Sequence, residues 1–332
     1  MSNFKIAKTL TLGLAVLFSW LAYGAGRPCA NTKFSVYNDL IRQVNIVAQV
    51  DAAGNISRKD PRRAVSVVGP LLGMSKAEIV QAYTSHGDVV CPGGKNHNPA
   101  KSSATIVGAG GVIFTIAHAF IDENRVVREP LSACYFENKT SPPTRVPLKF
   151  VDGSYEFLTR APSIDGANDF AFVALKHKID GAVPYRIDNS GETLRRGQQL
   201  ITISSSPERL EVPTVEPVAQ ACVVKQIFAA TATGRAYVLN DCAATPGGSG
   251  SINLARDSGG ELVIKALLRS GGPADQDYQP YKTTVPGAKD NSYGLSVAVD
   301  RVLNERLVEI QDKQNLKTVN NNPGEATKPT EL

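Results

Sequence analysis

Three short segments place a histidine, an aspartate and a serine in settings that suit nucleophilic catalysis. His118 ends the apolar stretch Thr-Ile-Ala-His, Asp169 directly precedes the alternating segment Phe-Ala-Phe-Val, and Ser249 lies in the glycine-rich turn Gly-Gly-Ser-Gly-Ser. A serine hydroxyl is a poor nucleophile at neutral pH, so it needs an imidazole as its base and an acid that fixes the imidazole tautomer. The three residues therefore predict acyl-transfer chemistry.

The glycines next to Ser249 suit a second requirement of this chemistry, an oxyanion hole. Glycine adopts backbone angles that other residues avoid, so such a turn can aim backbone N–H groups at a developing negative charge. We expect the N–H groups of Gly247 and Ser249 to form this hole. The chemistry needs no metal or cofactor, and no cysteine pair has the close spacing of a zinc site.

The three segments, taken in order, resemble the sequence boxes of the chymotrypsin family of serine proteases. Thr-Ile-Ala-His is similar to that family's Thr-Ala-Ala-His box, Asp-Phe-Ala-Phe-Val to its Asp-Ile-Ala-Leu box, and Gly-Gly-Ser-Gly-Ser to its Gly-Asp-Ser-Gly-Gly box. The spacing also matches, with 51 residues from His118 to Asp169 and 80 from Asp169 to Ser249. The Pro-Gly-x-Ser-Gly-Ser form is most similar to the bacterial glutamyl-endopeptidase-like branch.

The resemblance covers roughly residues 104–312 and implies both a fold and an activity. The fold would be all-β, with two packed antiparallel six-stranded β-barrels and a C-terminal helix. The activity would be that of a serine endopeptidase on protein or peptide substrates. His118 would act as general base and then general acid, Asp169 would orient it, and Ser249 would attack the peptide carbonyl.

Two of these residues have competitors in the sequence. Asp165 lies close to Asp169, but only Asp169 is followed directly by a strand-like segment. Ser258 lies in Asp-Ser-Gly-Gly at 257–260, the literal string of the family, yet it leaves no room for the hairpin that the family places before its cleft-lining strand. We therefore favour Ser249 and expect 257–260 to be the hairpin turn, where aspartate and glycine are common.

The residue before the candidate nucleophile departs from the family pattern. It is Gly248, where the family usually has an aspartate that pairs with a freshly cut N-terminus. Ile-Val-Gly at 106–108 resembles the family's activation N-terminus, but it begins only 12 residues before His118, in a strand-like segment. We expect no activation switch of the trypsinogen type.

The resemblance also suggests residues for the substrate pocket. Ala243, followed by Ala244, lies six residues before the nucleophile, where a trypsin would carry an aspartate, so selection of arginine or lysine is not expected. Arg269, Ser270 and Gly271 end the segment that matches the cleft-lining strand. Arg269 would either face an acidic substrate side chain or point to solvent, which leaves an acidic preference and a small or apolar preference both open.

The N-terminus has the pattern of a cleaved export signal, which we assign to residues 1–24. Lys5 and Lys8 precede an apolar run, and small residues follow at 22–24. This pattern predicts a secreted or periplasmic protein that has no membrane segment after cleavage.

The five cysteines fit an oxidising compartment, which allows two disulfides and leaves one cysteine over. Cys91 and Cys134 bracket the segment that carries the candidate histidine, and we expect them to pair. Cys222 and Cys242 flank the strands that lead to the nucleophile loop, so a disulfide between them would brace that loop. Cys29 would then remain.

The rest of the chain divides into three parts. Residues 25–100 form an N-terminal extension or a possible propeptide, with a helix that Ser75 caps; 101–312 carry short β-rich runs between glycine and proline turns and form the protease domain; 313–332 carry almost nothing apolar and predict a disordered tail. With 42% hydrophobic and 20% charged residues, the chain is not wholly disordered, coiled-coil or collagen-like. A net charge of +5 without a basic stripe gives no reason to expect nucleic-acid binding.

Two other functions are compatible with the same residues. A catalytically silent binding protein on this fold is disfavoured because all three triad residues are present. A lipase-type esterase is disfavoured because those enzymes order their triad as Ser, Asp and His. Ester cleavage by the same triad stays open, as do the P1 specificity, the natural substrate, the fate of residues 25–100 and the oligomeric state.

Overall fold

The described residues all belong to one compact unit, Val44–Leu332. The expected signal peptide, most of the expected N-terminal extension and the last part of the expected tail lie outside them. The computed structural model describes residues 62–93, 99–121, 126–128, 130–150, 169–205, 214–229, 236–244, 247–273 and 291–320.

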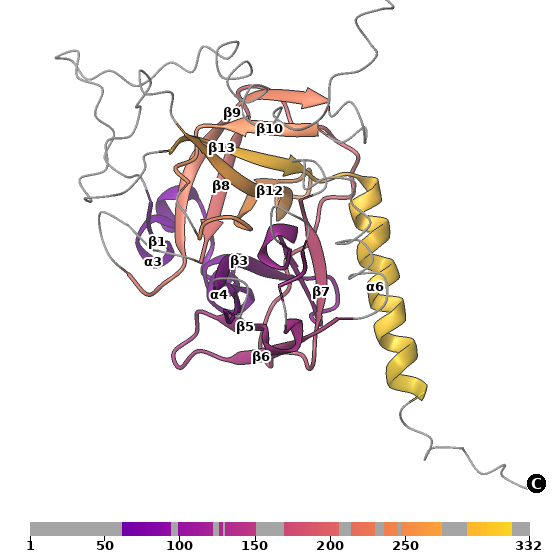
Figure 1. The fold of residues 1–332 in the computed structure, drawn as a ribbon. Coiled ribbons are helices and arrows are strands. Elements are labelled where there is room, and N and C mark those ends of the chain that lie inside the picture. Colours follow the sequence, from indigo (N-terminus) through magenta and orange to yellow (C-terminus); the bar gives the residue numbers. More distant parts are fainter. Residues whose placement is uncertain are drawn as a thin grey trace, which may run out of the picture. The chain divides into compact units, whose positions relative to one another are not determined.

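The first barrel is a closed sheet of six antiparallel strands (Figure 1). Along the sheet the strands follow the order β2-β3-β4-β7-β6-β5, and β2 closes the barrel by pairing with β5. A short 3-10 helix, η3 (Leu131–Ala133), precedes β5. The strands are β2 (His86–Cys91), β3 (Ala100–Val107), β4 (Val112–Thr115), β5 (Tyr135–Asn138), β6 (Arg145–Lys149) and β7 (Ala171–Leu175).

The second barrel is built from the later strands in the order β9-β10-β13-β12-β11-β8, and pairing of β8 with β9 closes it. A two-residue strand, β1 (Arg63–Ala64), pairs with the start of β9. The strands are β8 (Gln199–Ser204), β9 (Val218–Ala229), β10 (Ala236–Asn240), β11 (Ile252–Arg256), β12 (Leu262–Pro273) and β13 (Asn291–Ala298). Two six-stranded antiparallel barrels with a C-terminal helix confirm the expected fold class, which is chymotrypsin-like.

The first barrel begins earlier than the sequence indicates. The expected protease domain starts at residue 101, but β2 lies before that point and pairs with both β3 and β5. The strand was missed because His86 and Asp88 are polar, although both are buried. A boundary at 100/101 therefore cuts through the barrel, and the extension contributes one of its strands.

A small helical segment precedes β2. It contains α3 (Val65–Val68), the 3-10 helix η1 (Pro70–Leu72) and α4 (Lys76–Ser85). Ser75 and Glu78 form the expected capping box at the start of α4, because each side chain bonds to the backbone N–H of the other residue. Glu78 also pairs with Arg256 of β11, which ties this segment to the second barrel.

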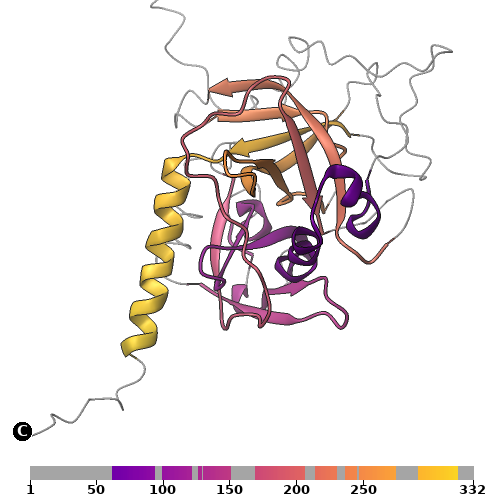
Figure 2. The ribbon, with the colours of Figure 1, turned by 180° about the vertical axis from the view of Figure 1, so that it is seen from behind.

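The C-terminal helix α6 (Arg301–Asn320) packs against β7, and both views show it beside the first barrel (Figures 1 and 2). Asp300 caps it by accepting a hydrogen bond from the N–H of Leu303 at 2.9 Å. The helix continues to Asn320, into the segment 313–332 for which the sequence predicts a disordered tail. A helix that is already anchored extends easily through polar residues, because each added residue gains a hydrogen bond. No helix among the described residues is both long enough and apolar enough to cross a membrane.

Candidate active site

His118 and Asp169 meet at the ends of two paired strands. His118 lies on η2 (Ala117–Ala119), which follows β4, and Asp169 lies two residues before the start of β7, the neighbour of β4 in the sheet. His118 Nδ1 lies 2.6 Å from Asp169 Oδ2, and the backbone N–H of His118 donates to Oδ1 at 2.9 Å. Asp169 is fully buried, whereas the His118 side chain is 38% exposed. A proton held on Nδ1 leaves Nε2 available to act as a base.

A third donor reaches the same carboxylate. Arg269 of β12 donates from Nε to Asp169 Oδ2 at 3.0 Å. The sequence suggested that Arg269 faces either a substrate or solvent. In the structure it contacts Asp169 instead. Burial lowers the pKa of Arg269 to about 10, so its guanidinium stays charged at neutral pH. The contact therefore places a positive charge beside the acid that orients His118.

Ser249 lies in a tight turn whose shape depends on glycine. Gly247 and Gly250 have φ values of 86° and 87°, a region that side chains disfavour. A Cβ on Gly250 would lie 1.9 Å from the carbonyl oxygen of Ser103 and 2.9 Å from Thr115 Oγ1. The turn therefore packs directly against the strand end that leads to His118, and no larger residue fits at position 250.

The backbone around Ser249 leaves two N–H groups available. Within the described part of the chain, the N–H groups of Gly247 and Ser249 have no hydrogen-bond acceptor. Within the same part, no hydrogen bond joins Ser249 and His118. Catalytic hydrogen bonds are often long until a substrate binds, so a serine and a histidine that are not yet hydrogen-bonded are compatible with nucleophilic chemistry.

The competing serine occupies a hairpin turn, as expected. β11 and β12 pair antiparallel, and the turn between them is closed by hydrogen bonds from Asp257 N to Glu261 O at 2.9 Å and from Gly260 N to Asp257 O at 3.0 Å. Ser258 is exposed at its tip. The other competitor, Asp165, lies outside the described residues.

The expected pocket residues lie on two different strands or their ends. Ala244 is buried, and Ala243 is held by Gln220, whose side-chain amide accepts from the Ala243 N–H at 2.9 Å and donates to its carbonyl at 2.8 Å. Ser270 and Gly271 pair with β13. Sequence reasoning missed Gln220, although a glutamine within an apolar strand was a usable signal.

Both expected cysteine pairs are bonded. Cys91 of β2 is linked to Cys134, just before β5, and Cys222 of β9 is linked to Cys242, just after β10. The first disulfide lies within the first barrel rather than between an extension and the barrel, because β2 is a barrel strand. Cys29 lies outside the described residues.

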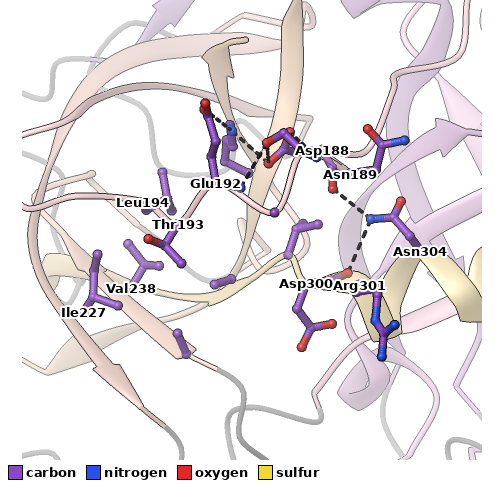
Figure 3. Close-up of a pocket in the computed structure, with 16 residues that line it drawn as sticks. Asp188, Asn189, Glu192, Thr193, Leu194, Ile227, Val238, Asp300, Arg301 and Asn304 are labelled. Atoms are coloured by element: carbon purple, nitrogen blue, oxygen red, sulfur yellow. Dashed lines mark hydrogen bonds and ion pairs between the residues drawn. The ribbon is translucent and has the colours of Figure 1, made fainter. Parts of the chain in front are cut away.

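A separate cavity of about 460 Å³ opens on the second barrel at the start of α6 (Figure 3). Leu194, Ile227 and Val238 line one end, and Asp188 and Asn304 line the other. None of the candidate triad residues lines this cavity. It is therefore distinct from the site around His118.

Three solved structures similar to this chain are 10–15% identical to it, with TM-scores below 0.5. No family model and no curated protein matches the chain. Among solved structures, the Rv3671c protease of M. tuberculosis in its active form is 10% identical, with a TM-score of 0.47, over 78% of this chain and 92% of that one. The HtrA-type protease AlgW with a decapeptide is 12% identical, with a TM-score of 0.44, over 70% and 66% of the two chains. The thermostable serine protease AL20 from an extremophilic microorganism is 15% identical, with a TM-score of 0.45, over 68% and 96%.

Proposed function

We propose that this protein is an exported serine endopeptidase that uses His118, Asp169 and Ser249. The observation that carries the proposal is the 2.6 Å contact between His118 Nδ1 and the buried Asp169, next to the Ser249 turn. A buried carboxylate on Nδ1 fixes the tautomer that a base needs. The N–H groups of Gly247 and Ser249 supply an oxyanion hole beside the same serine.

The reaction follows from these positions. Ser249 Oγ attacks the peptide carbonyl while His118 Nε2 takes its proton, and the two backbone N–H groups stabilise the oxyanion. The protonated His118 then gives its proton to the leaving amine, which leaves an acyl group on Ser249. Water, activated by the same imidazole, hydrolyses this ester.

The substrate we propose is a protein or peptide with a small or apolar residue at P1. Arg269 was the residue that favoured an acidic preference, and its contact with Asp169 removes that reason. Ala243 and Ala244 offer no charge in the pocket. The likeness of the Ser249 turn to the glutamyl-endopeptidase-like branch therefore concerns the nucleophile and not the specificity.

We also propose that the protein works outside the cytoplasm. Two disulfides are typical of oxidising compartments, and the pattern at residues 1–24 is typical of an export signal. The fold limits how much of residues 25–100 could be a propeptide, because removing all of them would take away β2. Any processing cut would lie before His86.

Fluorophosphonate labelling tests the proposal. The mature protein, its Ser249→Ala variant and its Ser258→Ala variant are treated with the probe, and the second variant is the matched control because its serine is exposed in a turn only nine residues away. We expect labelling of wild type and Ser258→Ala and none of Ser249→Ala. An unlabelled wild type would favour the silent binding protein, and loss with Ser258→Ala alone would contradict the assignment of the nucleophile.

A further inference from the structure

We propose that Ser251 and Ser103 are positioning residues that hold the oxyanion hole in its working orientation. The inference rests on the proposed function, and it concerns how the Gly248–Ser249 peptide is kept in place. This peptide lies between Gly247 and Gly250, both with positive φ, and Gly248 has no side chain that could anchor it. This peptide plane rotates about ψ of Gly248 and φ of Ser249, and the glycine on one side lowers the cost of a flip, so other contacts must fix it.

Ser251 holds the carbonyl side of this peptide. Its Oγ donates to Gly248 O at 2.5 Å, and its backbone N–H donates to the same oxygen at 3.1 Å. The C=O and N–H of a trans peptide point in opposite directions. Two donors on Gly248 O therefore turn the Ser249 N–H away from Ser251, toward the position where an oxyanion would form.

Ser251 is itself fully buried and tied to β12. Its carbonyl accepts from the N–H of Leu268 at 2.7 Å, and Leu268 O accepts from the N–H of Gly250 at 2.7 Å. The turn is thus fixed on one side by the second barrel. The other side is fixed by Ser103 of β3, whose N–H donates to Ser249 O at 2.8 Å.

The Ser103 hydroxyl joins the two barrels. It lies 3.0 Å from Ser205 Oγ and accepts from the Ser205 N–H at 3.2 Å, just beyond the end of β8. It also lies 3.5 Å from Ser251 Oγ. The Ser103 carbonyl accepts from Thr115 Oγ1 at 2.7 Å, so the same residue contacts the strand end before His118.

A buried carboxylate fixes where the Ser205 hydroxyl donates. Ser205 Oγ donates to Asp88 Oδ1 at 2.8 Å, and Asp88 Oδ2 accepts from Lys139 at 2.5 Å. An ionised carboxylate only accepts, and each hydroxyl has a single proton to donate. Ser205 therefore gives its proton to Asp88, and the Ser103 hydroxyl has Ser204 Oγ at 3.4 Å as a further partner. Ser251 Oγ lies 2.5 Å from Gly248 O but 3.5 Å from Ser103 Oγ, so its proton goes to Gly248 O.

The closing experiment compares Ser251→Ala and Ser103→Ala with wild type, with Ser258→Ala as the matched control. The measurements are kcat and KM on a peptide substrate, inhibition by a peptide aldehyde and binding of the product peptide. An aldehyde forms a tetrahedral adduct whose oxygen occupies the oxyanion hole, whereas a product peptide makes no such adduct. The ratio of these two affinities thus isolates the hole from general damage.

For Ser251→Ala we expect kcat to fall about tenfold or more, short of the roughly 100-fold loss typical of deleting a donor outright, because Ser251 N still holds Gly248 O. Aldehyde affinity should fall in parallel, with KM and product binding within twofold of wild type. Ser103→Ala should follow the same pattern more weakly and stands in if Ser251→Ala does not fold. If wild type is active and kcat is unchanged in both variants, this inference alone is overturned. The same holds if product binding falls as much as aldehyde affinity. A wild type without activity overturns the proposed function as well.

Discussion

An aromatic cluster in the first barrel contrasts with a polar network in the second. Phe114 of the first barrel is stacked on Phe172 with ring centroids 4.7 Å apart and is in edge contact with Phe170 at 6.5 Å. These rings belong to a large apolar cluster that also takes in Leu303 and Leu307 of α6 and, from the second barrel, Ile203, Ile252 and Ile264. Apolar packing of this kind is strong but non-directional.

The second barrel contains a network of directional bonds between polar side chains. Buried Asn253 accepts from Thr202 Oγ1 at 2.6 Å and donates to Ser296 Oγ at 2.6 Å, and Asn240 donates to the same hydroxyl at 3.1 Å. The apolar cluster beside this network contains no aromatic residue among its described members, which are Leu194, Leu200, Cys222, Val224, Val238, Cys242, Ala255 and Ala266.

The difference corresponds to what each barrel must hold. The first barrel carries His118 and Asp169, which bond to one another and need only a rigid support. The second carries the Ser249 turn, whose peptide planes must point in fixed directions. A fully paired polar network specifies one arrangement, because any shift leaves a buried group without a partner. We therefore expect loss of a ring in the aromatic cluster to act through a cavity and loss of Asn253 to act through unpaired polar groups.

The largest effect should come from Phe114→Ala in the first barrel. Removing a buried ring leaves a cavity, and such substitutions destabilise by about 3–5 kcal/mol. Urea unfolding measures the change, with Leu71→Ala as control because Leu71 is 83% exposed. A loss below about 1 kcal/mol would mean that the ring cluster does not carry the first barrel.

Asn253→Ala should have a smaller effect with a different signature. It removes the acceptor of Thr202 Oγ1 and one of the two amide donors to Ser296 Oγ, and leaving a buried polar group unpaired typically costs about 1–3 kcal/mol. The double variant Asn253→Leu with Thr202→Val replaces both members of one bond by apolar groups, and we expect it to recover part of the loss. If the double variant were additive in urea unfolding, directional bonding would not explain the second barrel.

Features that rest on a local pattern or on spacing could be predicted from the sequence. These are the capping box at Ser75, the hairpin turn around Ser258 and both disulfides. The strand β2 could not be predicted, since the burial of His86 and Asp88 depends on partners from other strands. His86 bonds to Thr105 and Asp88 to Lys139. Chemical type alone indicates an exposed segment.

The direction of Arg269 was unpredictable for a different reason. The pairing of β12 with β13 shifts register between Leu268 and Ser270, so Arg269 sits at an irregularity. Such a bulge re-aims a side chain that alternation would assign to one face or the other. The contact with Asp169 therefore follows from backbone geometry that the sequence does not reveal.

His86 gives the first barrel its own pH dependence. Burial, reinforced by the charge of Lys139, lowers the pKa of His86 to about 3, whereas an unfolded histidine titrates near 6.5. Below pH 6.5 the unfolded chain therefore binds a proton that the folded chain does not, and stability falls as the pH is lowered. His86→Asn, which can still accept from Thr105, should remove this slope in urea unfolding. His177→Asn, at an exposed position, should keep it, and an unchanged slope in His86→Asn would refute the assignment.

The smallest effect on activity should come from Arg269→Gln. Arg269 belongs to the second barrel and contacts Asp169, the acid carried by the first. Losing the positive charge beside Asp169 makes protonation of His118 easier, so the acidic limb of the kcat/KM profile should move to higher pH. At pH 8 the change in kcat/KM should stay within about tenfold. Arg186→Gln, in an exposed ion pair with Asp257, is the control. A limb that moves to lower pH would contradict the electrostatic role.

The most direct test of the whole account is cleavage of a peptide library by wild type and by Ser249→Ala, with the new N-termini read by mass spectrometry. We expect wild type to cut internal peptide bonds after small or apolar residues, and Ser249→Ala to cut none. Internal cuts that persist in Ser249→Ala, or a fluorophosphonate-reactive wild type that cleaves esters but no peptide, would contradict the assignment of this protein as a serine endopeptidase.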